Sequence, residues 1–182
     1  MVPPSFQNTE SASARQYVRR LPSGHLECVL GPSGAGKSFY AMTRIREAVA
    51  QGRGVTLFDV SNEHAEQMCQ LEGTVVKAGD IRESLDLSVP PGKPLLVLFE
   101  DVLSNTGKAS DEKQLAQWSR LEPLLLARMV RGDLLVLNDT EYLQHSIVAP
   151  TALQTFLGKL LLRGVEVVLT MQAEASYAEL CS

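Results

Sequence analysis

The chain alternates between continuous hydrophobic runs and segments in which hydrophobic residues recur every three or four positions. Continuous short runs are typical of strands buried on both faces of a parallel sheet. The segments between them predict helices, and the alternation predicts an α/β fold: a three-layer domain with a mostly parallel sheet of about five strands. The predicted strands are HLECVL (25–30), GVTLFDV (54–60), PLLVLFED (94–101), LLVLN (134–138) and VEVVLTM (165–171), with VVKAGD (75–80) as a shorter extended piece.

Glycines and capping residues mark the limits of the predicted helices. Gly52, Gly132 and Gly164 each follow an amphipathic segment and are expected to end it. Ser61 or Asn62 is expected to cap the second helix. The predicted helices cover 37–51, 62–71, 114–131, which contains Pro123, and 150–163, which opens with a capping box of Thr151 and Gln154.

The remaining segments are polar. Residues 104–113 are predicted to form a loop, and residues 1–16, rich in Pro, Ser, Thr, Asn and Gln, a flexible leader. The rest of the chain, 17–182, is of a length that forms one domain with a single core.

Composition restricts the possible partners and the compartment. The net charge is -4, so DNA would have to be met by a local basic patch or by an oligomer. The three cysteines are scattered, which indicates reduced thiols and excludes a disulfide framework. No apolar run reaches the ~18 residues of a transmembrane segment. We therefore expect a cytoplasmic protein without a membrane span.

The segment GPSGAGKS, residues 31–38, carries the clearest chemistry of the sequence. It matches the pattern G-x-x-x-x-G-K-[ST] and lies between a predicted strand and a predicted helix. Glycines allow the backbone N–H groups of such a loop to turn inward, and the following helix adds partial positive charge at its N-terminus. The segment is therefore predicted to hold the phosphates of a nucleotide.

This residue set resembles the signature of the P-loop NTPases, a family with a RecA-like fold that binds ATP and Mg²⁺. The resemblance implies that Lys37 reaches the β and γ phosphates and that the Ser38 hydroxyl binds Mg²⁺. The residues expected to contact the nucleotide are Gly31, Ser33, Gly34, Ala35, Gly36, Lys37, Ser38 and Phe39.

An NTPase also needs an acidic group at the end of a neighbouring strand, and two strands could supply it. The run 134–138 is followed by Asp139 and, two residues later, by Glu141, whereas the run 94–101 ends in Glu100 and Asp101. We favour the first, in which Asn138 stands where an Asp facing magnesium through water is usual and Asp139 acts as the catalytic acid. In the alternative, the acids of 94–101 take that role and Asn138 is a polar sensor.

Further segments resemble the FtsK/HerA superfamily, which includes DNA translocases and the conjugation and type IV secretion ATPases. Asp59 and Glu63 are similar to a D-x-x-x-E pattern after the second strand, and 84–86 to a turn in the secretion ATPases. The final match, LLRGVEVVLTMQ, implies that Gln172 senses the γ phosphate through the attacking water and that Arg163 points at the nucleotide of a neighbouring subunit. The sequence departs from the family pattern at two places. Asn138 and Asp139 stand where Asp-Glu is usual, and Met171 stands where Thr is usual.

The resemblance implies a Mg-ATP-dependent motor or accessory ATPase in DNA or protein transfer, homo-oligomeric when active, with DNA or the secretion and conjugation machinery as partners. Two alternatives stay open. A small-molecule kinase would need cations on a lid, for which Arg120, Arg128 and Arg131 are the candidates. A nucleotide-binding switch with little turnover is the other, and the departure at Asn138 favours it.

Overall fold

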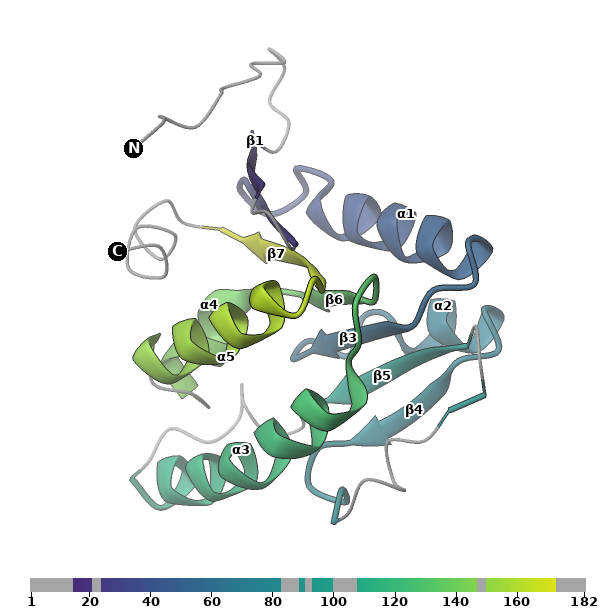
Figure 1. The fold of residues 1–182 in the computed structure, drawn as a ribbon. Coiled ribbons are helices and arrows are strands. Elements are labelled where there is room, and N and C mark those ends of the chain that lie inside the picture. The colour runs from purple at the N-terminus through teal and green to yellow at the C-terminus, as the bar shows by residue number, and fades with distance from the viewer. Residues whose placement is uncertain are drawn as a thin grey trace.

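A seven-stranded sheet forms the centre of the molecule (Figure 1). The computed structural model describes residues 15–20, 24–82, 89–90, 93–99, 108–146 and 150–172. The strand order is β1-β2-β7-β6-β3-β5-β4, with every described neighbour pair parallel except β1 and β2. The strands are β1 (Arg15–Arg20), β2 (His25–Leu30), β3 (Val55–Asp59), β4 (Thr74–Lys77), β5 (Pro94–Leu98), β6 (Leu134–Leu137) and β7 (Glu166–Met171).

Helices cover both faces of this sheet, which gives three layers (Figure 1). On one face lie α1 (Lys37–Ala50) and α2 (Ala65–Gln70). On the other lie α3 (Lys108–Arg128), α4 (Thr140–Ser146) and α5 (Pro150–Leu162). The predicted α/β architecture with a mostly parallel sheet is therefore confirmed, although the sheet has seven strands where about five were predicted. None of the described helices has the length and hydropathy of a transmembrane span.

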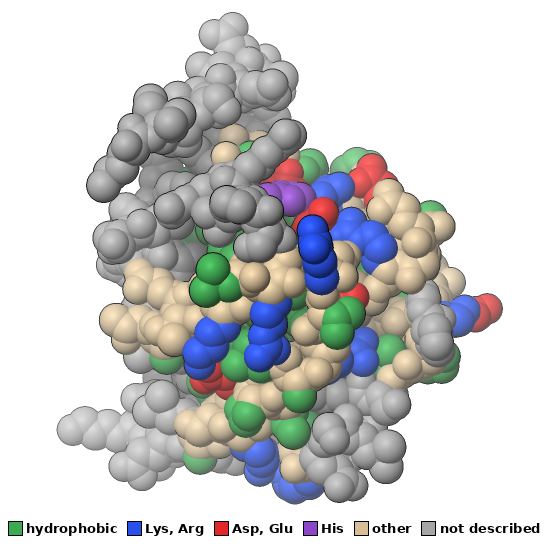
Figure 2. Space-filling model, viewed as in Figure 1, with side chains coloured by type: hydrophobic (Ala, Val, Ile, Leu, Met, Phe, Trp, Pro, Cys, Tyr) green, Lys and Arg blue, Asp and Glu red, His purple; other side chains and the backbone are tan. Residues whose placement is uncertain are grey.

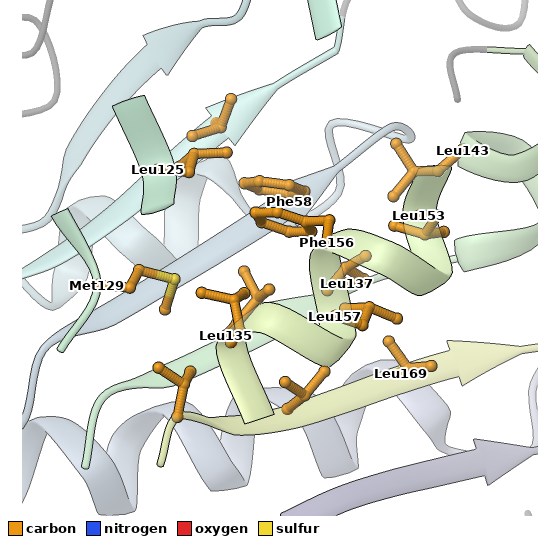
Figure 3. Packing of buried hydrophobic residues seen from close by; sticks show 14 of the residues in the cluster. Phe58, Leu125, Met129, Leu135, Leu137, Leu143, Leu153, Phe156, Leu157 and Leu169 are labelled. Atoms are coloured by element: carbon orange, nitrogen blue, oxygen red, sulfur yellow. The ribbon is translucent and has the colours of Figure 1, made fainter. Parts of the chain in front are cut away.

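Neighbouring residues of each central strand serve two separate cores, because successive side chains of a strand point to opposite faces. Leu57 of β3 packs with Ile45 of α1 and Met68 of α2. Phe58, the next residue, packs on the other face with Trp118 of α3 and Phe156 of α5. Figure 3 shows this second core between α5 and the sheet. Since both faces are covered, the strands are apolar without alternation, as the sequence showed.

Aromatic side chains connect the elements of this second core. The Trp118 ring meets the rings of Phe58 and Phe156 edge to face, with centroids 6.3 Å and 5.1 Å away. This packing holds α3 and α5 against the sheet. α3 continues through Pro123, where a kink or the start of a second helix was expected.

Several elements differ from the prediction. β1 and α4 were not predicted, and β1 includes residues 15 and 16 of the expected leader. The predicted loop 104–113 is wrong from residue 108, where α3 begins, because the hydrophobic periodicity used to set its start appears only later in the helix. α2 begins at Ala65 and has no side-chain cap, so the predicted cap at Ser61 or Asn62 is also wrong.

Candidate nucleotide-binding site

Residues 31–36 connect the carboxyl end of β2 to α1, whose first two residues, Lys37 and Ser38, complete the predicted phosphate-binding segment. The Gly31 N–H donates a hydrogen bond to the Met171 carbonyl at the end of β7, 3.2 Å away, which fixes the start of the loop to that strand. Gly34 and Gly36 have φ angles of 78° and 88°, which glycine adopts without steric cost. A Cβ built on either glycine would meet no other atom within 4 Å, so the loop borders open space.

Lys37, the first residue of α1, folds back over this loop. Its side chain is buried, and its ammonium donates hydrogen bonds to the carbonyl oxygens of Gly31 (2.9 Å) and Pro32 (3.1 Å). An ammonium has three protons to donate, and these contacts use two. The lysine is therefore positioned by the loop backbone with a donor left for an anion.

The N-terminus of α1 lies at the same loop and borders the open space beside Gly34 and Gly36. Gly36 is its N-cap, no side chain caps the helix, and its first turn contains no acidic residue. The first N–H groups of a helix lack intrahelical partners and carry partial positive charge. Ser38 in this turn is partly exposed and Phe39 is exposed. The loop, the lysine and the helix end together form a site suited to phosphate.

The residues after β6 are tied to β7 by a small hydrogen-bond network. The Thr170 hydroxyl of β7 donates to Asn138 Oδ1 (2.9 Å) and accepts from the Asp139 N–H (2.9 Å). Asn138 is fully buried, and its amide nitrogen donates to Asp139 Oδ2 at 3.1 Å. Asp139 has a left-handed backbone with φ 50°. This network fixes where the Asp139 carboxylate lies.

The Asp139 carboxylate lies within electrostatic reach of Lys37. Burial and the nearby charge of Glu141 raise the pKa of Asp139 to about 6, while the positive charge of Lys37 acts in the opposite direction. The exposed Glu63 on the loop after β3 raises this pKa further. Carboxylates that follow β6 and β3, and the lysine of the loop, therefore all act on the charge of Asp139.

Glu141 joins this site from the first turn of α4. Its Oε1 accepts a hydrogen bond from the Gln172 N–H at 3.1 Å, and Gln172 follows directly on Met171, whose carbonyl binds the start of the loop. The Gln172 side chain is exposed. Sequence reasoning noted Glu141 but gave it no role, since the unpredicted helix α4 is what turns it toward β7.

The strand order distinguishes the two candidate acidic strands. β6 is two places from β2, with β7 between them, whereas β5 is four places from β2. At about 4.8 Å per strand, β6 ends roughly 10 Å from the loop strand and β5 roughly 19 Å. Glu100 and Asp101 lie outside the described residues. The end of β6 is therefore the better placed of the two.

Asp59 organises the loop that follows β3. Its Oδ1 accepts hydrogen bonds from the Ser61 N–H (3.0 Å) and hydroxyl (2.8 Å), and its Oδ2 from the His64 N–H (3.0 Å) and Nδ1 (3.1 Å). These bonds shape residues 61–64 into a turn, with Asn62 at φ 59°. For this reason α2 starts after His64. The turn brings Glu63, the second acid of the predicted D-x-x-x-E pattern, toward Asp139. The other predicted resemblance, at 84–86, lies outside the described residues.

Arg163 lies apart from these groups. It follows α5 and precedes β7, so it belongs to the amino ends of the strands, whereas the loop is at their carboxyl ends. Its guanidinium is exposed and donates a hydrogen bond to the Leu126 carbonyl. Arg163 therefore does not contribute to the site of its own chain, and a role toward a neighbouring subunit stays a prediction.

The oxygen atoms at the site suit a magnesium ion that shares its coordination with phosphates. Mg²⁺ takes one or two carboxylates and hydroxyls together with phosphate oxygens and water. Ser38 and Asp139 supply oxygens of this kind near Lys37. The described part of the chain contains no group of three or more His, Cys, Asp or Glu side chains arranged to hold a metal.

The three-layer fold with its mostly parallel sheet is similar to that of one solved structure. A solved structure of VirB4 from Thermoanaerobacter pseudethanolicus is similar to this chain with a TM-score of 0.56 and 12% identity, covering 83% of this chain and 71% of that one. A likeness at this identity concerns the fold alone. The sequence matches no family model and no curated protein.

Proposed function

We propose that this protein binds Mg-ATP in the loop 31–38 and hydrolyses it as an ATPase of DNA or protein transfer, of the conjugation or secretion type. One observation supports ATP binding above all others. The buried Lys37 ammonium lies over a glycine loop at an uncapped helix N-terminus, with the carboxylate of Asp139 nearby. This arrangement suits the triphosphate of a nucleotide and the cation that accompanies it.

Each side chain has a distinct task in this proposal. A bound magnesium ion would neutralise charge that builds up on the β and γ phosphates. Ser38 and Asp139 are the oxygen donors that would hold it, which changes the role of Asp139 from the catalytic acid that the sequence predicted. Asn138 was predicted to reach magnesium through water, but its amide is engaged with Thr170 and Asp139, so we assign it the task of fixing Asp139.

Lys37 and Gln172 would act on the phosphates and the water. Lys37 has a donor left after its two bonds to the loop, and it would place that donor on the β and γ phosphates. Gln172 follows β7, beside the start of the loop, and its exposed amide would orient the attacking water.

The place of this activity in transfer rests on two independent similarities. The sequence resembles the FtsK/HerA superfamily in the segments around Asp59, Arg163 and Gln172, and the fold is similar to VirB4. We therefore propose that the partners are DNA or a secretion or conjugation machinery, that the active form is a homo-oligomer, and that it acts in the cytoplasm. Lys and Arg side chains lie interspersed among uncharged ones on the face shown in Figure 2. Because the net charge is -4, binding of DNA would need a local basic patch or an oligomer.

The packing of α3, the helix that carries Arg120 and Arg128, gives little support to the kinase alternative, which needs these arginines on a mobile lid. Trp118, Leu121 and Leu125 of α3 are buried against the sheet. Burial lowers the pKa of Arg128, while Asp133 opposes that shift. A helix packed in this manner is a structural layer and does not move over a substrate. The second alternative, a nucleotide-binding switch, would use the same site and would differ from the proposed ATPase only in hydrolysing little or no ATP.

The test is ATP binding and turnover by the purified protein, with and without single- and double-stranded DNA, compared with Lys37→Ala. Loss of a charge-assisted donor is expected to weaken Mg-ATP binding by about 10- to 100-fold and to abolish turnover. Lys159→Ala is the matched control, because Lys159 is exposed on α5 and pairs with Glu122 away from the site.

The outcomes separate the alternatives. Turnover that rises with DNA and disappears in Lys37→Ala supports the motor. Tight binding without turnover under any condition supports the switch. Equal binding by wild type and Lys37→Ala would refute the proposal.

A further inference from the structure

Glu141 carries a buried oxygen atom without a partner. Its side chain is 9% exposed, and its Oε2 is shielded from solvent and makes no hydrogen bond to any described residue. Burying a carboxylate oxygen without a donor costs free energy, and native proteins seldom leave such an atom unpaired unless a ligand or water binds there. This cost indicates a group that Glu141 receives when the site is filled.

The other oxygen of Glu141 fixes the direction of the side chain. Oε1 accepts the Gln172 N–H, and the carbonyl of the preceding Met171 accepts the Gly31 N–H, so two hydrogen bonds connect Glu141 through the end of β7 to the loop. The charge of Glu141 also acts on Asp139, which feels Lys37 as well. Glu141 is thus a member of the charged groups around the loop.

Asp139 is held in place close enough to Lys37 to feel its charge. Its Oδ2 already accepts a hydrogen bond from the Asn138 amide, and its backbone is fixed by Thr170. Its position near Lys37 suits a carboxylate that faces the cation accompanying the phosphates. Glu141 is longer and is oriented by Gln172, and its second oxygen, unlike those of Asp139, is buried without a hydrogen-bond donor.

We propose that Glu141, and not Asp139, is the catalytic base of the site; this inference rests on the proposed ATPase function. In the nucleotide-bound site, which has to admit a water to this buried oxygen, Glu141 Oε2 accepts a hydrogen bond from the water that attacks the γ phosphorus and takes its proton. The water oxygen forms a bond to that phosphorus, and the bond from phosphorus to the β–γ bridging oxygen breaks. ADP leaves with the electron pair, and the products are ADP and inorganic phosphate.

Single-turnover hydrolysis and calorimetric binding of Mg-ATP, measured on Glu141→Gln and Asp139→Asn, test this assignment. Glu141→Gln is expected to bind Mg-ATP within about threefold of wild type and to hydrolyse it at least about 100-fold more slowly at every Mg²⁺ concentration. Asp139→Asn is expected to recover a large part of its lost rate as Mg²⁺ is raised. The assignment is overturned if Glu141→Gln keeps the wild-type rate, or if Mg²⁺ restores it.

Thermal unfolding without nucleotide gives a second readout that does not depend on turnover. Glu141→Gln is expected to raise the unfolding midpoint by about 2–4 °C, because an unpaired neutral amide costs less than an unpaired carboxylate. Glu166→Gln is the matched control and is expected to lower it, since Glu166 pairs with Arg53 at 2.7 Å and Arg44 at 3.5 Å.

The failures of the two proposals can be told apart. A midpoint that falls in Glu141→Gln as it does in Glu166→Gln shows a structural carboxylate and overturns the assignment. Wild-type protein that binds Mg-ATP without hydrolysing it overturns the role of Glu141 and leaves nucleotide binding in place. Wild-type protein that binds no nucleotide refutes the proposed function, and the assignment with it.

Discussion

Asp59 illustrates how one buried side chain shapes the site without contacting it. Its carboxylate is 1% exposed and accepts bonds from both the backbone and the side chains of Ser61 and His64. Burial alone would raise the pKa of Asp59, but the hydrogen bonds from His64 and Ser61 outweigh it and lower the pKa to about 2. The ionised form is therefore the one that holds the turn carrying Glu63.

This shift makes a prediction about stability and pH. Because the pKa of Asp59 is below its ordinary value of 3.8 in the folded state, its contribution is present above pH 4 and is lost as the pH falls toward 2. Asp59→Asn is expected to reduce the free energy of unfolding at pH 7 by about 2 kcal/mol. Urea unfolding between pH 3 and pH 7 should show a difference from wild type that shrinks on acidification.

Asp80→Asn is the control for this measurement, since Asp80 is exposed. It should leave the unfolding free energy within about 0.5 kcal/mol of wild type. If the loss of unfolding free energy in Asp59→Asn is the same from pH 7 to pH 3, the ionised carboxylate of Asp59 does not stabilise the turn, and the prediction is wrong.

At the scale of elements, a buried carboxylate joins β1, β2 and α1. Glu27 of β2 is 4% exposed and accepts hydrogen bonds from Gln16 of β1 and from Tyr40 and Arg44 of α1. Burial and the bond to Glu27 raise the pKa of Tyr40. The helix that carries Lys37 is therefore attached to the sheet by polar bonds as well as by its hydrophobic face.

Glu27→Gln is expected to reduce the free energy of unfolding by about 1–3 kcal/mol, because the charge-assisted bond from Arg44 to the buried Glu27 carboxylate is lost or weakened. Amide hydrogen exchange in β1 should also become faster. Glu47→Gln is a close control, since Glu47 pairs with the same Arg44 from an exposed position on α1, and such a pair contributes about 0.3–0.5 kcal/mol. Equal effects of the two changes would show that the junction is not stabilised by Glu27.

At the scale of the whole molecule, the two ends of the parallel strands carry different groups. The loop, Asp139 and Glu141 lie at the carboxyl ends, whereas Arg163 lies at the amino ends. β7 has six residues, which separates the two ends by about 20 Å. One chain therefore cannot place Arg163 on its own nucleotide, and a second copy is required for the predicted role.

Arg163→Ala is therefore expected to leave Mg-ATP binding by the isolated chain unchanged. Turnover per chain should rise with protein concentration in wild type, and the variant should lose at least about tenfold of the rate at high concentration, because a cation from a neighbour stabilises the charge of phosphoryl transfer. Arg131→Ala, an exposed arginine also near the amino ends, is the control. A wild-type rate in Arg163→Ala at high concentration would contradict the role in a neighbouring site.

The sequence by itself determined the layered architecture and the glycine loop between β2 and α1, because both depend on local information. Buried parallel strands must be apolar throughout, and a loop around phosphate needs its glycines, lysine and hydroxyl close together in the chain. Tertiary structure decided the rest. The order of strands is set by contacts between distant segments, and it places the end of β6 nearer to the loop than the end of β5. The same packing forms α4, turns Glu141 toward Gln172 and removes Arg163 from the site. The spacing of residues along the chain does not predict these contacts, because each contact depends on which strands pair in the sheet.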